Sequence, residues 1–167
     1  MDTYDVRKAT ALFGLFARTD TWQVPTLAAL RTVWNGQRNK LSAPDATAAD
    51  RVWTRTLAMF ADSRKAGVRT LAGSDLPVAD GVPPLHDELV ALVGAGMTSM
   101  EALQAATRSP AEFLGRLATE GTVEVGKKAN LVLLDASPVA DISNTRQVAA
   151  VILNGRLIRG SDLQKFR

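Results

Sequence analysis

Asp75 is the acidic residue whose position best suits chemistry. It follows a short apolar run, residues 68–72, through the dipeptide Gly73-Ser74. In parallel α/β folds, catalytic side chains stand directly after the carboxyl ends of buried strands. An aspartate at such a position is suited to binding a divalent cation or to accepting a proton from metal-bound water. The pattern alone favours a simpler role, in which Asp75 stabilises a turn before Pro77, and one carboxylate does not make a site.

His86 is the second candidate. It is the only histidine, and the chain has no cysteine. One copy therefore cannot supply two or three imidazole ligands, and thiolate chemistry and disulfides are excluded. His86 stands early in a predicted helix, where it is suited to contacting a ligand, although the pattern favours a local hydrogen bond. No glycine-rich phosphate loop with the required spacing occurs, and nothing beyond residue types points to a Ser-His-Asp triad.

Helix and strand signals alternate over the first 117 residues. In order, they predict a helix over 6–16, a strand over 22–27, a surface loop over 35–45, a helix from Thr47 to Gly67 and a buried strand over 68–72. Pro25 favours extended backbone before it, and Thr47 with Asp50 weakly resembles a capping box. Such alternation is typical of parallel strands with crossover helices. Two short parallel strands do not make a stable sheet, so flanking strands are expected from elsewhere.

The remaining signals predict helices before Gly115 and strands after it. They predict, in order, a helix over 85–93, short helices beginning at Thr98 and at Ser109, and strands over 131–134, 148–153 and 156–159. Thr98 with Glu101 and Ser109 with Glu112 both match the capping-box pattern. Asn154-Gly155 predicts a tight hairpin turn, so the tail should be a small antiparallel unit.

The composition limits the classes of binding partner to expect. The 167 residues carry a net charge of +3, and the basic residues are spread along the chain. Nucleic-acid binding needs a basic stripe, so no nucleic-acid partner is expected. No apolar run approaches the ~20 residues that span a bilayer, so no membrane partner is expected either. The N-terminus lacks the pattern of an export signal, and we expect a cytoplasmic location. Trp22, Trp34 and Trp53 are interpreted as packing residues.

Several longer motifs stand out along the chain. They are Val24-Pro25-Thr26-Leu27, Ala72-Gly73-Ser74-Asp75, His86-Asp87-Glu88-Leu89, Ala95-Gly96-Met97-Thr98, Ser109-Pro110-Ala111-Glu112, Ala129-Asn130-Leu131-Val132-Leu133-Leu134-Asp135 and Val151-Ile152-Leu153-Asn154-Gly155. Together they closely resemble the amidohydrolase superfamily, in particular its imidazolonepropionase-like and prolidase-like branch. Ser74 replaces a common threonine and Asn130 a common aspartate, and neither change removes a metal ligand.

The resemblance implies an α/β fold: the C-terminal part of a (β/α)8 barrel, followed by part of a small β-sandwich. Residues 1–117 would hold the last two barrel strands, 22–27 and 68–72, with their helices, and residues 118–167 would form the C-terminal β unit. The resemblance also implies that Asp75 is a metal ligand and the catalytic proton shuttle. His86 is the candidate substrate-binding residue.

The resemblance also implies a reaction, the hydrolysis of an amide, cyclic amide or Xaa-Pro-type carbon–nitrogen bond in a small molecule by metal-activated water. Zinc is the expected metal. The family's other metal ligands would precede Met1, so we expect a C-terminal fragment that neither catalyses nor stably holds metal alone. It would then pair with an upstream barrel chain or with itself. The alternative is a non-catalytic assembly or interaction module.

Overall fold

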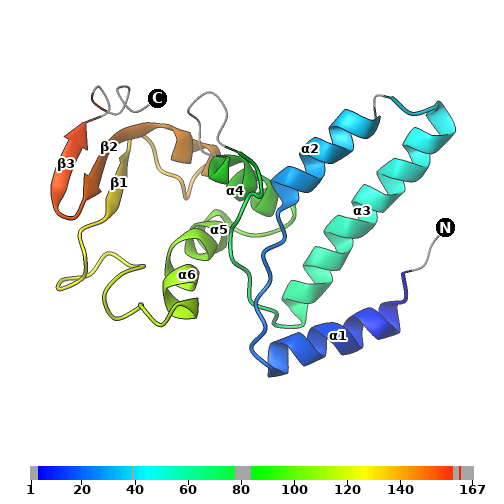
Figure 1. The fold of residues 1–167 in the computed structure, drawn as a ribbon, viewed down its shortest axis with the longest axis horizontal. Coiled ribbons are helices and arrows are strands. Elements are labelled where there is room, and N and C mark those ends of the chain that lie inside the picture. Colours follow the sequence, from blue (N-terminus) through cyan, green and yellow to red (C-terminus); the bar gives the residue numbers. More distant parts are fainter. Residues whose placement is uncertain (1–3, 39, 78–83, 160–161, 163–167) are drawn as a thin grey trace.

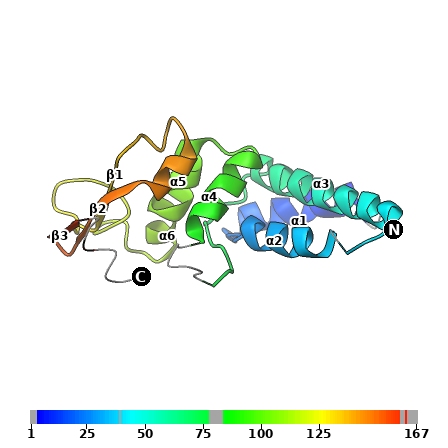
Figure 2. The same ribbon diagram turned by 90° about the horizontal axis from the view of Figure 1, so that it is seen from above.

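The computed structural model describes residues 4–38, 40–77, 84–159 and 162. In chain order the elements are α1 (Val6–Arg18), α2 (Leu27–Arg38), α3 (Ala43–Lys65), α4 (Leu85–Gly94), α5 (Ser99–Ala106), α6 (Arg108–Phe113), β1 (Leu131–Leu134), the 3-10 helix η1 (Ile142–Arg146), β2 (Val148–Leu153) and β3 (Arg156–Arg159). Helices α1 to α3 lie at one end of the molecule, the sheet lies at the other end, and α4 to α6 lie between them (Figures 1 and 2). No helix in the described part is both long and apolar enough to cross a membrane.

Helix α1 confirms the helix predicted near the N-terminus. The side chain of Asp5 accepts hydrogen bonds from the backbone N–H groups of Arg7 and Lys8, which otherwise have no partner at a helix start. Phe13 is the buried residue of α1, and the helix lies against α3. The helix continues two residues beyond the predicted end at Phe16.

Helix α2 corrects the prediction of a strand over 22–27 and part of the predicted loop over 35–45. The extended backbone ends before Leu27, which begins α2, and Asn35 lies within the helix. Leu27, Leu30 and Trp34 are spaced as on one helical face, a signal that the Asn35-Gly36 turn pattern obscured. The prediction failed because the cap of α2 comes from a distant residue, Glu88.

Helix α3 begins earlier than its predicted start at Thr47. Ser42 is the N-cap, its hydroxyl accepts from the backbone N–H of Asp45, and Pro44 lies in the first turn, where its missing N–H costs nothing. The loop predicted over 35–45 is therefore restricted to the few residues between α2 and α3. The predicted end of the helix near Gly67 is confirmed, since Lys65 is the last helical residue.

Helices α4 and α5 carry much of the core. Leu92 and Ala102 are fully buried and cluster with Leu27 and Phe60 from α2 and α3. The predicted capping box of α5 is confirmed, because Thr98 accepts from the N–H of Glu101 and Glu101 accepts from the N–H of Thr98.

The second predicted capping box, at Ser109 and Glu112, is wrong. Helix α6 begins at Arg108, its N-cap is Thr107, and no side chain caps it. Ser109 and Pro110 lie inside the first turn, because α6 follows α5 without the extended residue that a capping box needs.

The C-terminal sheet has the order β1-β2-β3 and is antiparallel throughout. Asn154 and Gly155 both have positive φ, 50° and 79°, which confirms the predicted tight hairpin between β2 and β3. The side chain of Asn130, just before β1, accepts from the N–H of Asn154 at 2.7 Å. This contact ties the hairpin turn to the strand at the other edge of the sheet.

Candidate functional site

Two short extended segments meet at the candidate site, and an isolated β-bridge joins them where strands over 22–27 and 68–72 were predicted. Gln23 and Thr70 form a parallel β-bridge, in which the N–H of Gln23 donates to the carbonyl of Arg69 and the N–H of Leu71 donates to the carbonyl of Gln23, both at 2.9 Å. The segments run in the same direction, so their carboxyl ends lie at the same end of the pair. Residues that follow these ends are therefore brought near one another.

The ends of both segments have unusual backbone geometry. Thr26 follows the first at φ 48° and Asp75 follows the second at φ 50°, in the left-handed region that L-residues avoid. Such residues cost ~1–3 kcal/mol each and cluster where function constrains the backbone. Gly73 also brings the two ends close, because a Cβ atom there would lie 2.6 Å from Cγ1 of Val24.

Asp75 is exposed at the carboxyl ends of the two segments. Within the described residues it forms no hydrogen bond and no ion pair, and nothing joins it to His86. No cluster of three or more histidine or acidic side chains that would hold a metal occurs in the described part of the chain. Asp75 alone is one potential ligand and not a metal site, so these residues do not fit a resident metal on their own.

Glu88 is the most deeply buried charged residue of this region. Its side chain, on α4, is 0% exposed, and its Oε2 accepts from the backbone N–H of Ala28 at 2.7 Å. Burial raises the pKa of Glu88, while the N–H groups of Ala28 and Leu27 act in the opposite direction. Its Oε1 has no hydrogen-bond partner among the described residues. Glu88 thus caps α2 across the fold, directly after Thr26.

His86 is the second residue of α4, and its side chain contacts η1. Its Nδ1 lies 3.1 Å from Oγ1 of Thr145, whose hydroxyl donates to the carbonyl of Ile142 at 2.8 Å. The hydroxyl has one proton, so Nδ1 of His86 acts as the donor. Burial lowers the pKa of His86, the positive charge of Arg146 lowers it further, and Asp87 acts in the opposite direction. This contact fits the local structural role, and the substrate-binding role of His86 stays a prediction.

Arg146 reinforces the same junction. Its Nη2 lies 2.7 Å from Oδ1 of Asp87, so two side-chain contacts join the start of α4 to η1. Both side chains are partly exposed, and the ion pair is expected to contribute at most ~1 kcal/mol. The junction links the start of α4 to η1, the 3-10 helix that precedes β2.

Comparison with known proteins places this arrangement in a family. Residues 21–158, most of the chain, match the amidohydrolase family. The chain belongs to the amidohydrolase family.

Individual relatives agree with this assignment. This amidohydrolase chain is 35% identical over 97 residues to an imidazolonepropionase of Maricaulis maris (strain MCS10), and 44% identical over 59 residues to an N-substituted formamide deformylase of Arthrobacter pascens. The first match covers 53% of the chain and 24% of the relative, and the second covers 35% and 10%. A solved Xaa-Pro dipeptidase with bound methionine superposes with a TM-score of 0.75 at 29% identity, over 93% of this chain and 38% of the dipeptidase. The chain thus spans well under half of each of these proteins.

Sequence reasoning singled out Asp75 and His86 in this amidohydrolase chain and missed Glu88 as a site-supporting residue. The only sequence signal for Glu88 was its place in the motif shared with the family. Its role depends on Ala28, which lies 60 residues earlier, and no local pattern encodes that contact. The predicted boundary between domains at residue 117 stays a prediction.

Proposed function

We propose that this chain forms the carboxyl-terminal part of a (β/α)8 amidohydrolase barrel and brings Asp75 to its active site. Residues 22–24 and 68–72 would be neighbouring barrel strands, and an upstream polypeptide would supply the remaining strands. Catalytic groups of such barrels stand at the carboxyl ends of the strands, where Asp75 lies. Residues 118–167 would form part of the accompanying β-sandwich.

The observation that carries the proposal is that backbone groups at the centre of each segment's outer edge are unpaired among the described residues. Because the N–H and C=O of Gln23 both face the second segment, those of Trp22 and Val24 face away from it. No backbone hydrogen bond joins Trp22 or Val24 to another described segment, and the same holds for the N–H and C=O of Thr70. Further along the second segment, the N–H of Ala72 donates to the carbonyl of Ala105 at 2.9 Å. Val24 is also 49% exposed. Two consecutive strands of a barrel, taken without their outer neighbours, would present such unpaired groups on both sides.

The proposed chemistry is hydrolysis of a carbon–nitrogen bond. An N-substituted formamide and an Xaa-Pro dipeptide, named for two of the relatives, share a carbon–nitrogen bond of amide type. A small molecule with such a bond is the proposed substrate. Amidohydrolases generally use divalent metal ions, and Asp75 would be one ligand and a proton acceptor in a site completed by the upstream barrel. Zinc is the proposed metal.

Complementation tests this proposal. The chain is co-expressed with a polypeptide that carries the upstream barrel of an imidazolonepropionase or Xaa-Pro dipeptidase relative, and hydrolysis of the corresponding substrate is measured. We expect activity that Asp75→Asn abolishes and that Asp62→Asn, an exposed control on α3, leaves intact. A co-purified complex that shows no hydrolysis, or equal activity with Asp75→Asn, would count against the proposal.

The second candidate is a non-catalytic assembly module. Large apolar side chains are exposed on the C-terminal sheet; they include Val132, Leu133, Leu153 and Leu157. Such side chains, together with unpaired strand edges, favour association with a second copy. Light scattering of the purified chain distinguishes this candidate, because it requires oligomers, and a monomer at high concentration would exclude it.

A further inference from the structure

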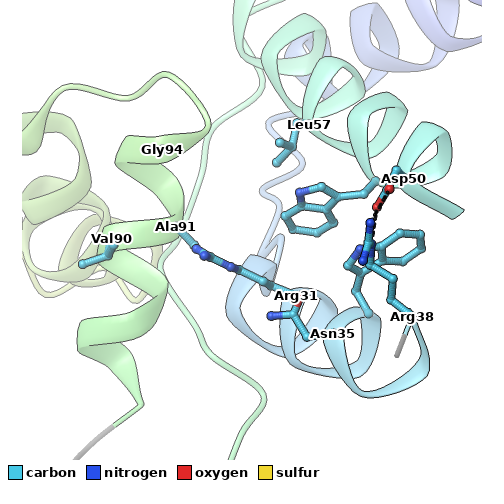
Figure 3. A pocket seen from close by; sticks show the side chains of 10 residues that line it. Arg31, Asn35, Arg38, Asp50, Leu57, Val90, Ala91 and Gly94 are labelled. Atoms are coloured by element: carbon cyan, nitrogen blue, oxygen red, sulfur yellow. Dashed lines mark hydrogen bonds and ion pairs between the residues drawn. The ribbon is translucent and has the colours of Figure 1, made fainter. Parts of the chain in front are cut away.

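A cleft of about 700 Å³ lies between α2, α3 and α4 (Figure 3). Neither Asp75 nor His86 lines it. Its walls are formed by Arg31, Trp34, Asn35, Arg38, Asp50, Trp53, Leu57, Val90, Ala91 and Gly94. The volume falls within the ~300–1,000 Å³ that is usual for small-molecule sites, which combine apolar walls with a few polar groups.

Two arginines line the cleft, and they differ in whether an acidic side chain pairs with them. Nε and Nη2 of Arg38 donate to the two carboxylate oxygens of Asp50 at 2.8 and 3.0 Å, so this pair is neutral overall. Arg31 has no acidic partner among the described residues. Its side chain extends from α2 across the cleft towards Ala91 of α4 (Figure 3). Among the residues that the structure describes, the cleft therefore carries one uncompensated positive charge.

The walls next to this charge are aromatic. Trp34 on α2 and Trp53 on α3 are both partly exposed and both line the cleft. An indole ring has a flat apolar face on which a planar ligand stacks. A guanidinium presents a fork of N–H donors that matches a carboxylate. The combination distinguishes this cleft from a second hollow of about 240 Å³, whose lining includes Gln23 and no charged residue.

We propose that the cleft binds a small aromatic carboxylate. The carboxylate would accept hydrogen bonds from Arg31, the ring would lie against Trp34 and Trp53, and Leu57 would close the apolar side. Asn35 would provide a further donor at the rim. The Arg38–Asp50 pair would hold α2 against α3 and keep the two indole-bearing helices in place.

The test uses two probes of the same shape and different charge, 2-naphthoate and 2-naphthamide. Calorimetric titration of the full 167-residue chain at neutral pH is expected to show ~10-fold tighter binding of naphthoate, since only the carboxylate accepts charge-assisted hydrogen bonds from Arg31. Arg31→Gln should remove this preference and leave naphthamide affinity nearly unchanged. Trp53→Leu should weaken both probes.

The matched control is Arg51→Gln, an exposed arginine on α3 that does not line the cleft. It changes net charge as Arg31→Gln does and should leave both affinities unchanged. Circular dichroism of each variant checks that the helices persist. Equal affinity for the two probes, equal losses in the two arginine variants, or no naphthoate binding to the folded wild-type chain would overturn the proposal.

Discussion

Glu88 of α4 accepts a 2.7 Å hydrogen bond from the backbone N–H of Ala28, sixty residues earlier in the chain. This contact caps α2 from outside, where a local Ser, Thr or Asp would ordinarily stand. It also joins the helix that follows Asp75 to the helix that follows Thr26. One buried carboxylate therefore joins α2 and α4, the helices that come next along the chain after the two segments of the candidate site.

The acceptor role of Glu88 is tested with two variants of similar length. Glu88→Gln keeps a carbonyl oxygen for the N–H of Ala28, whereas Glu88→Met removes every acceptor and leaves that buried donor unpaired. We expect Glu88→Met to be ~1–3 kcal/mol less stable than Glu88→Gln in urea unfolding followed by circular dichroism. Equal stabilities would show that the hydrogen bond contributes nothing. Asp135→Asn, at an exposed position whose side chain forms no hydrogen bond or ion pair among the described residues, should change stability by less than ~0.5 kcal/mol.

Glu88 should also give the protein a specific pH dependence. Burial raises the pKa of Glu88 in the folded state above its ordinary value of 4.5, so folding favours the protonated carboxyl. The corresponding stability is fully present below the unfolded-state pKa and is lost as pH rises through the folded-state pKa. Urea unfolding at several pH values should therefore show Glu88→Gln gaining stability over wild type as pH rises above 4.5. A difference that is constant with pH would contradict the raised pKa.

His86 should titrate below its ordinary pKa of 6.5, because burial and the charge of Arg146 both disfavour the imidazolium. Since the chain has a single histidine, its imidazole signals in an NMR titration are assigned without ambiguity. Arg146→Gln should raise this pKa by removing a positive charge and leaving Asp87 unpaired. Arg156→Gln on β3 serves as the control. An unchanged His86 pKa in Arg146→Gln would show that the two groups do not interact.

Gly73 should resist substitution because of its approach to Val24. An added Cβ would lie 2.6 Å from Cγ1 of Val24, a stiff β-branched side chain, so Gly73→Ala should cost ~1–3 kcal/mol in urea unfolding. The double variant Gly73→Ala with Val24→Ala should be at least ~0.5 kcal/mol more stable than the sum of the two single effects predicts. Additive effects would mean that the clash is relieved elsewhere, and the close approach would then not be what requires glycine.

Local sequence signals predicted the elements whose determinants lie a few residues apart. The capping box of Thr98 and Glu101 and the hairpin at Asn154-Gly155 were predicted correctly, because each depends on hydrogen bonds or φ angles within four residues. The same reasoning failed at Ser109, where the end of α5 leads directly into α6. Helix α2 was missed because its cap is supplied by a residue far along the chain.

The motifs in the sequence by themselves determined the family and singled out Asp75 at the end of an extended segment, because family membership and strand-to-turn patterns are encoded in contiguous residues. Only the tertiary structure decided that Gln23 pairs with Thr70, that Glu88 caps α2, and that Arg31, Trp34 and Trp53 face one cleft. These relationships join residues up to 60 positions apart. They depend on how helices pack over a shared core, and helical periodicity specifies which face is apolar without specifying which helix will cover it.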